Sequence, residues 1–195
     1  MVRLVSILIL ILFVSCHQPK ESSINQDKTT IVLQPFDHFE SKLAAIVSDS
    51  LKKYFANVVI FPATSHPNQA FVKLRKRYRA DTIIRVLRDL HQKDTITVGL
   101  THQDISATKN NIADWGVMGL GYRPGRACVI STFRLKNQNK SEQLVKVVLH
   151  EIGHTLGLKH CSNKTCLMRD AEGGNPLDEE KDFCVKCKRL FVISK

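Results

Sequence analysis

Three histidines and one glutamate, grouped in one short stretch, are the residues of this sequence best suited to chemistry. His150, Glu151, His154, Gly157 and His160 occupy the fixed places of the pattern HExxHxxGxxH. Residues four apart on a helix lie about 6 Å apart along one face, so His150 and His154 can present two imidazoles to one ion. Glu151 then points beside that ion, where a reacting water would lie. The spacing therefore predicts a metal site with an acid–base group next to it.

Gly157 and His160 complete this predicted site. Glycine readily adopts the positive φ that ends a helix, so the chain can turn back after Gly157. The turn would bring His160 to the same ion from another direction. Three neutral nitrogen ligands leave a tetrahedral zinc ion with one open position, which is typical of hydrolytic zinc sites.

Four cysteines follow the histidines in two closely spaced pairs. Cys161 and Cys166 come first, and Cys184 and Cys187 form a CxxC pair. Such a set is typical of a closed structural zinc site. Two disulfides are the alternative, because an exported protein can form them. Cys128 lies in an apolar stretch and is expected to be a buried thiol.

The run HEIGHTLGLKHC, followed by Cys166–Leu–Met168 and by the CxxC pair, resembles the archaemetzincins, which are zinc peptidases of metzincin type. This resemblance implies that the three histidines bind a catalytic zinc ion and that Glu151 is the general base. It also implies that the four cysteines hold a second, structural zinc ion, giving two Zn²⁺ per chain. Met168 would form the Met-turn beneath the catalytic zinc.

The length and composition suit one soluble domain. The chain has 195 residues, of which 43% are hydrophobic and 24% charged. These values are ordinary for a globular protein with a well-formed core. The formal net charge of +11 favours contact with anionic surfaces or acidic substrates but carries no information about the fold.

The first residues predict export. Arg3 precedes the apolar run Leu4–Val14, which is short for a membrane span but suits a signal peptide. Its end, Phe13–Cys16, resembles the lipobox of bacterial lipoproteins, so Cys16 is the expected lipid anchor. Ordinary cleavage with secretion and an uncleaved membrane anchor are the alternatives. We therefore expect a signal peptide at 1–15, a polar tether at 16–30 and a peptidase domain at 31–195, in a membrane-anchored lipoprotein that faces the periplasm or cell exterior.

Apolar periodicity predicts a mixed order of helices and strands in that domain. Helices are expected from an Asp37 cap to about Phe55, from about Asp81 to His91, and along the histidine stretch after a Ser141 cap. Strands are expected at Ile31–Phe36, Val58–Phe61, Thr95–Leu100, Trp115–Tyr122 and Ala127–Phe133. The first two should pair in parallel, and the turn Arg123–Arg126 should make the last two antiparallel. The Gly-rich stretch Trp115–Tyr122 is a candidate for aligning substrate.

The basic run Lys73–Arg79 has two interpretations. It could bind nucleic acid or anionic lipid, or it could be a solvated surface segment whose side-chain stems cover apolar area. Only Tyr78 is interleaved with the basic residues, and no recognition motif accompanies them, which favours the surface segment.

The sequence thus predicts an α/β domain of metzincin type, with a mixed twisted sheet, a zinc-binding helix and a C-terminal subdomain clamped by four cysteines. The expected function is hydrolysis of peptide bonds, either aminopeptidase-like or as an endopeptidase. The alternative is a non-catalytic, zinc-stabilised binding domain at the membrane surface. The expected partners are a peptide or protein substrate and the membrane reached through the lipid. No nucleic acid is expected, and the chain is expected to be a monomer.

Overall fold

The computed structural model describes residues 29–90 and 94–192. The predicted signal peptide, Cys16 and nearly all of the predicted tether lie outside the described residues. In the part of the chain that is described, no helix has the length and apolarity needed to cross a membrane.

The main sheet has five strands in the order β2-β1-β5-β9-β8. These are β1 (Thr30–Pro35), β2 (Asn57–Ile60), β5 (Thr95–Thr101), β8 (Gly119–Gly121) and β9 (Ala127–Ser131). The first four strands in this order run parallel, and β8 at the edge is antiparallel to β9. The mixed α/β fold, the parallel pairing of the first two strands and the antiparallel final pair are confirmed.

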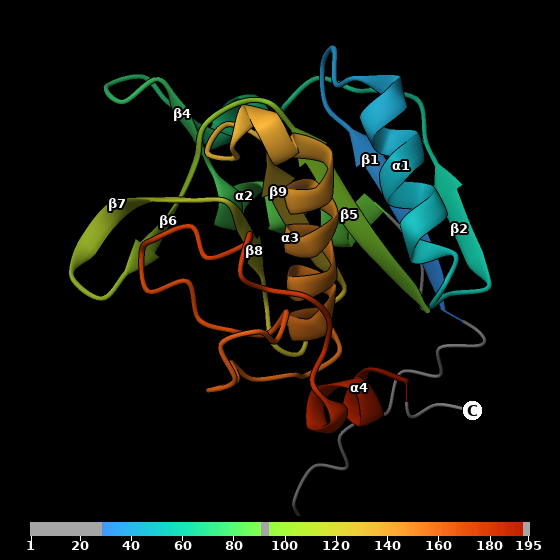
Figure 1. Cartoon of the computed structure of the whole chain (residues 1–195). Coiled ribbons are helices and arrows are strands. Elements are labelled where there is room, and N and C mark those ends of the chain that lie inside the picture. Colours follow the sequence, from blue (N-terminus) through green and yellow to red (C-terminus); the bar gives the residue numbers. More distant parts are fainter. Residues whose placement is uncertain (1–28, 91–93, 193–195) are drawn as a thin grey trace, which may run out of the picture.

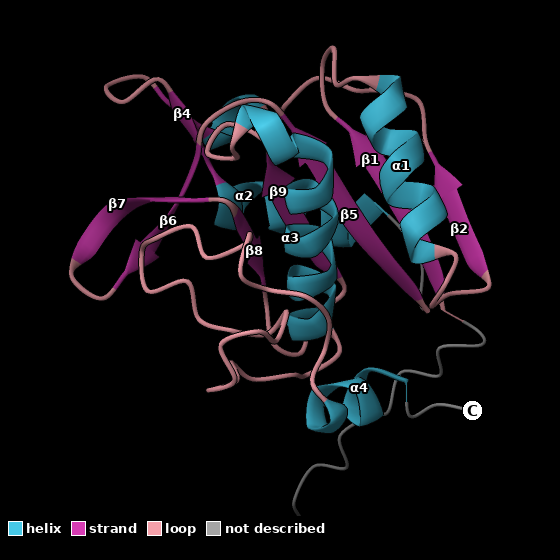
Figure 2. Cartoon of the chain, in the orientation of Figure 1, coloured by secondary structure: helices cyan, strands magenta, loops and turns pink. Residues whose placement is uncertain are grey.

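Three helices cover the two faces of this sheet (Figures 1 and 2). On one face lie α1 (Ser41–Leu51) and α3 (Lys140–Thr155), which pack against each other. On the other face lies α2 (Ala80–Leu90), against β5 and β9. A right-handed crossover helix is the usual connection between parallel strands, so the order β1-α1-β2 follows from the sequence pattern.

Apolar residues on both faces of β9 explain why the sheet is covered on both sides. Cys128 and Ile130 belong to the core under α1 and α3, whereas Ala127 and Val129 belong to the core under α2. All four are buried. Successive side chains of a strand point to opposite faces, so an unbroken apolar run needs a helix layer on each side.

A second sheet of four strands carries the basic run. Its order is β3-β4-β6-β7, from β3 (Phe71–Val72), β4 (Arg77–Arg79), β6 (Ile105–Lys109) and β7 (Ile112–Val117). Arg77 forms an ion pair with Asp104 at 3.0 Å, and Arg79 with Asp81 at 3.0 Å. Because these guanidinium groups already have carboxylate partners, the structure favours the surface-segment interpretation of the run.

Two predicted helix caps are wrong. Helix α1 begins after Glu40, and Asp37 instead has φ 50° and pairs its carboxylate with His66 at 2.7 Å. Helix α3 begins at Lys140, so Ser141 lies inside its first turn rather than at the cap. The predicted strand Trp115–Tyr122 is also divided, because the chain leaves β7 at Val117 and enters β8, in the other sheet, at Gly119.

Candidate metallopeptidase site

Helix α3 places two of the predicted ligands side by side. The rings of His150 and His154 have centroids 4.6 Å apart and are nearly perpendicular. The Nδ1 atom of His150 lies 2.6 Å from the carbonyl oxygen of Leu167, and that of His154 lies 2.8 Å from the carbonyl oxygen of Leu158. A carbonyl oxygen can only accept, so each Nδ1 donates its proton and each Nε2 keeps its lone pair.

The turn after α3 brings the third histidine to the other two. Gly157 has φ 96°, as predicted from its type and place. The Nε2 atom of His160 then lies 3.2 Å from the Nε2 atom of His154. On its other side, Nδ1 of His160 lies 3.1 Å from a carboxylate oxygen of Asp170. This pair holds the orientation of the third ring, as outer carboxylates do in many metal sites.

The three imidazoles fit a metal ion. One nitrogen from each lies within 4.8 Å of the others. Burial is the main cause that lowers the pKa of His150 to about 4, with the neighbouring His154 adding to it, and burial also lowers the pKa of His154. Both rings are therefore neutral near pH 7. Nitrogen lone pairs that converge without a proton between them are suited to a cation.

Glu151 lies buried at the edge strand β8, with 7% of its surface exposed. A Cβ added at Gly119 would come within 2.7 Å of the Glu151 carboxylate. A Cβ added at Gly121 would come within 2.7 Å of the backbone oxygen of Glu151. Burial raises the pKa of Glu151 to about 8, and a hydrogen bond from the Gly121 backbone opposes this rise. The close approach of β8 to α3 at this point therefore requires glycine on the strand.

The four cysteines of the two predicted pairs also come together. One sulfur atom from each lies within 4.8 Å of the others. The Sγ atoms of Cys161 and Cys184 are 3.8 Å apart, and the backbone N–H of Cys184 donates to Sγ of Cys166 at 3.3 Å. The distance between the Sγ atoms of Cys161 and Cys184 is far longer than the roughly 2.05 Å of a disulfide bond. The described cysteines are all free, which favours the metal alternative over disulfides.

A short helix, α4 (Val185–Val192), begins directly after Cys184. Cys184 therefore lies at the helix N-terminus, where backbone N–H groups favour a thiolate. A hydrogen bond from the backbone of Cys187 is the main cause that lowers the pKa of Cys184 to about 7. This element was not predicted, but it explains why a CxxC pair suits metal binding here.

Met168 lies between the two clusters and beneath α3. It is fully buried, and a Cβ added at Gly153 would come within 2.5 Å of its sulfur atom. Gly153 precedes His154, so the methionine packs against the part of the helix that carries the histidines. The Met-turn that the resemblance implies for Met168 stays a prediction.

A cavity of about 630 Å³ opens at the histidines. Its lining includes Glu151, all three histidines, the glycines of β8, Trp115 of β7 and most of the loop from Arg169 to Leu177. The cavity thus lies between α3, the sheet edge and the loop that follows Met168. This arrangement gives an extended chain access to the histidines and to Glu151.

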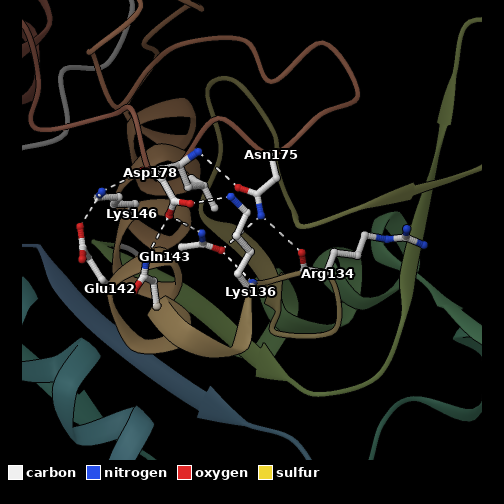
Figure 3. A network of polar contacts seen from close by, with 9 residues as sticks. Arg134, Lys136, Glu142, Gln143, Lys146, Asn175 and Asp178 are labelled. Atoms are coloured by element: carbon white, nitrogen blue, oxygen red, sulfur yellow. Dashed lines mark hydrogen bonds and ion pairs between the residues drawn. The ribbon is translucent and has the colours of Figure 1, made fainter.

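A polar network ties this loop to the start of α3 (Figure 3). The carboxylate of Asp178 accepts hydrogen bonds from Nζ of Lys136 at 2.5 Å and from Nε2 of Gln143 at 2.7 Å. These bonds lower the pKa of Asp178 to about 2, with Lys136 the largest cause. Lys146 donates to the carbonyl oxygen of Leu177 at 2.7 Å. The wall of the cavity is therefore fixed at several points.

Some contributors to the site were not predicted. Two of them are Asp170, the partner of His160, and the carboxylate Glu180, which also lines the cavity. Glu180 has no local sequence signal, since it is one acid in a polar loop. The Gly-rich stretch Trp115–Tyr122 is predicted to align substrate, and two of its glycines, Gly119 and Gly121, lie against Glu151. An acidic residue two places after Met168 could have pointed to a histidine partner.

Comparison with known proteins agrees with this geometry. The profile of peptidase family M54 matches residues 30–192. An archaemetzincin of Archaeoglobus fulgidus is 35% identical over 162 residues, covering 80% of this chain and 95% of that protein. An archaemetzincin of Halobacterium salinarum is 33% identical over 156 residues, covering 73% of this chain and 87% of that protein.

Solved structures agree as well. The crystal structure of the archaemetzincin of Archaeoglobus fulgidus, complexed with malonate, has a TM-score of 0.71 and 32% identity and covers 83% of this chain and 99% of that one. The crystal structure of the archaemetzincin of Methanopyrus kandleri also has a TM-score of 0.71, with 27% identity. It covers 89% of this chain and 97% of that one.

Proposed function

The chain belongs to peptidase family M54, the archaemetzincins, which are zinc metallopeptidases, and from this premise we propose that it hydrolyses peptide bonds with Glu151 as the general base. The observation that carries the proposal is the convergence of three imidazoles beside a buried glutamate in one cavity. His150, His154 and His160 would hold the catalytic zinc. Bound there, zinc supplies a Lewis acid that polarises a carbonyl group and makes a water more acidic.

The chain's own residues would perform the proton transfers. Glu151 takes a proton from the attacking water and gives it to the nitrogen of the leaving amine. Gly119 and Gly121 allow the strand to lie against Glu151, so that its carboxylate is held in one place. The hydrogen bonds of the histidine Nδ1 atoms and the contact of His160 with Asp170 fix the three rings before any ligand arrives.

We propose that the four cysteines hold a second zinc ion with a structural role. Cys161 follows His160 directly, and its backbone N–H donates to the carbonyl oxygen of Met168 at 2.8 Å. Ordering the cysteines would therefore also order the residues beneath the catalytic site. Four thiolates form a closed site with no open position for substrate.

The test of the function is a peptide library with free and with blocked amino termini, incubated with the zinc-loaded protein. We expect cleavage that a zinc chelator abolishes. Cleavage of blocked peptides would identify an endopeptidase, and cleavage restricted to free amino termini would identify an aminopeptidase. A protein that carries zinc and binds peptides but cleaves none would instead be the non-catalytic binding domain, and the proposal would fail.

We also propose that the chain is exported and held at a membrane by lipid on Cys16, on the basis of its signal-like first residues. Wild-type protein expressed in a bacterium is expected to enter the detergent phase in a Triton partition. Cys16→Ser should move it to the aqueous phase, because the acyl chains are lost. If the variant stayed in the detergent phase, an uncleaved apolar anchor would be the better explanation.

A further inference from the structure

Glu180 is a buried carboxylate for which the described part of the chain supplies no ion-pair partner. It lines the same cavity as the histidines, and only 3% of its surface is exposed. Its Oε2 atom is buried without a hydrogen-bond partner, and among the described residues no lysine, arginine or histidine forms an ion pair with it. An unpaired buried carboxylate is costly, so a protein rarely keeps one without a use for it.

The nearest positive charges do not compensate for this burial. Burial is the main cause that raises the pKa of Glu180 to about 7, against the weaker attraction of Lys146 and Arg169. Lys146 pairs with Glu142 at 2.7 Å, and Arg169 pairs with Glu179 at 2.6 Å. Both cations are therefore already engaged by other carboxylates.

Two of the three cations in the cavity lining, Arg134 and Arg169, are paired with carboxylates outside it, and the third, Lys109, lies over the ring of Trp115. The charged residues of the lining are Lys109, Arg134, Glu151, Arg169, Asp170, Glu172 and Glu180. Arg134 binds both oxygens of Asp104, at 2.8 and 3.0 Å, and Asp104 lies outside the lining. The paired arginines thus add little positive charge to the space inside, whereas Glu180, which lines it, forms no ion pair with a described residue.

Glu180 lies within reach of a substrate bound at the histidines. The cavity extends along α3 from His150 to Val147, a rise of three residues or about 4.5 Å. Leu177, whose carbonyl oxygen accepts a hydrogen bond from Lys146, lines the same cavity. The charge of Lys146 also acts on the carboxylate of Glu180, which places Glu180 near this part of α3. A long side chain of a peptide bound at the histidines therefore enters the cavity that Glu180 also lines.

We propose that Glu180 binds a positively charged group of the substrate and so gives the enzyme a preference for cationic peptides. This inference rests on the proposed peptidase function, whose substrate class it names. A guanidinium or ammonium group would supply the missing hydrogen bonds of Glu180, and such charge-assisted bonds are the stronger kind. The cation could be an arginine or lysine side chain or the amino terminus of the peptide.

The positive net charge of the protein does not oppose this preference at close range. The formal charge of +11 is a property of the whole chain. At physiological ionic strength, charges separated by more than about 8 Å are largely screened. The unpaired carboxylate inside the cavity therefore has more influence on a bound group than the distant surface lysines have.

The test compares peptides that differ only in charge. Labelled peptides with blocked amino termini would contain either arginine or citrulline, its neutral analogue, at each position in turn. Binding would be measured by fluorescence anisotropy on zinc-loaded protein carrying Glu151→Gln, to prevent cleavage, with and without Glu180→Gln. At one position we expect arginine to bind at least about 10-fold more tightly than citrulline. Glu180→Gln should remove this difference.

Asp89→Asn is the matched control, because it removes the same charge from an exposed site on α2, outside the cavity. It should keep the arginine preference. Citrulline peptides with free amino termini test whether the cation is instead the amino terminus of the peptide. If they bind more tightly than the same peptides with blocked termini, and Glu180→Gln removes this difference, the terminal amine is the cation.

The outcomes separate this inference from the peptidase proposal. Equal binding of charged and neutral peptides would overturn the role of Glu180, even if the wild-type protein cleaves both. A charge preference that depends on Glu180, in a protein that cleaves no peptide, would support the inference about the cavity and contradict the proposed catalysis. Absence of both binding and cleavage would overturn both.

Discussion

Glu151→Gln is expected to reduce peptide hydrolysis by at least about 10²-fold while zinc remains bound, because the glutamine amide cannot accept a proton from water. The histidines keep their geometry in this variant, since glutamine has nearly the same shape and Glu151 is not among the clustered nitrogen ligands. The measurements are kcat/KM on a cleaved peptide and zinc content by atomic absorption. Turnover near that of the wild type would refute Glu151 as the base.

Two further variants make this result specific. Glu40→Gln changes an exposed glutamate outside the cavity lining and should leave kcat/KM nearly unchanged. Gly119→Ala retains Glu151 but introduces a Cβ within 2.7 Å of its carboxylate, so that the side chain must move. We expect its activity to fall as well, with zinc retained. A loss in Gly119→Ala would show that the position of the carboxylate matters, in addition to its presence.

The clustering of the histidines and of the CxxC cysteines could be predicted from the sequence because local geometry determines it. Helical spacing fixes the relation of His150 to His154, and the positive φ of Gly157 fixes the return of the chain towards His160. The CxxC spacing likewise brings Cys184 and Cys187 together at one helix terminus. In each case the information lies within a few residues, so the pattern alone is sufficient.

The remainder of the site depends on contacts between distant segments. Gly119 lies against Glu151 only because β8 pairs with the edge of the main sheet. Nothing near Glu180 in the sequence shows that it will be buried, since it stands among other acids. The chain also changes sheets between Val117 and Gly119, and a continuous apolar stretch carries no sign of such a change.

The errors in the helix caps have a similar cause. Asp37 is a good capping residue by type, but its carboxylate is engaged by His66, whose other nitrogen lies 2.7 Å from the Thr101 hydroxyl. These partners come from segments about 30 residues or more away, so a local rule could not include them. The second sheet was missed for the same reason, because ion pairs such as Arg77–Asp104 support its short polar strands.

The protein is expected to contain two zinc ions per chain that differ in how easily they are lost. Three imidazoles at an open cavity should release zinc to a mild chelator, whereas four thiolates should retain theirs. Native mass spectrometry during chelation should show one ion leaving first, together with all activity. His154→Ala should reproduce that state, with one zinc and a Tm close to that of the wild type.

Cys187→Ser is expected to have a larger effect on stability, about 4 kcal/mol or more, because a structural metal site contributes directly to folding. The cysteine cluster holds the segment with Met168, which packs on Gly153 of the histidine helix, so activity should fall as well. Cys128→Ala removes a buried thiol of β9 outside the cluster and should keep two zinc ions. One zinc in the wild-type protein, with no free thiols among the four clustered cysteines, would mean that they form disulfides, and the proposed structural zinc site would be wrong.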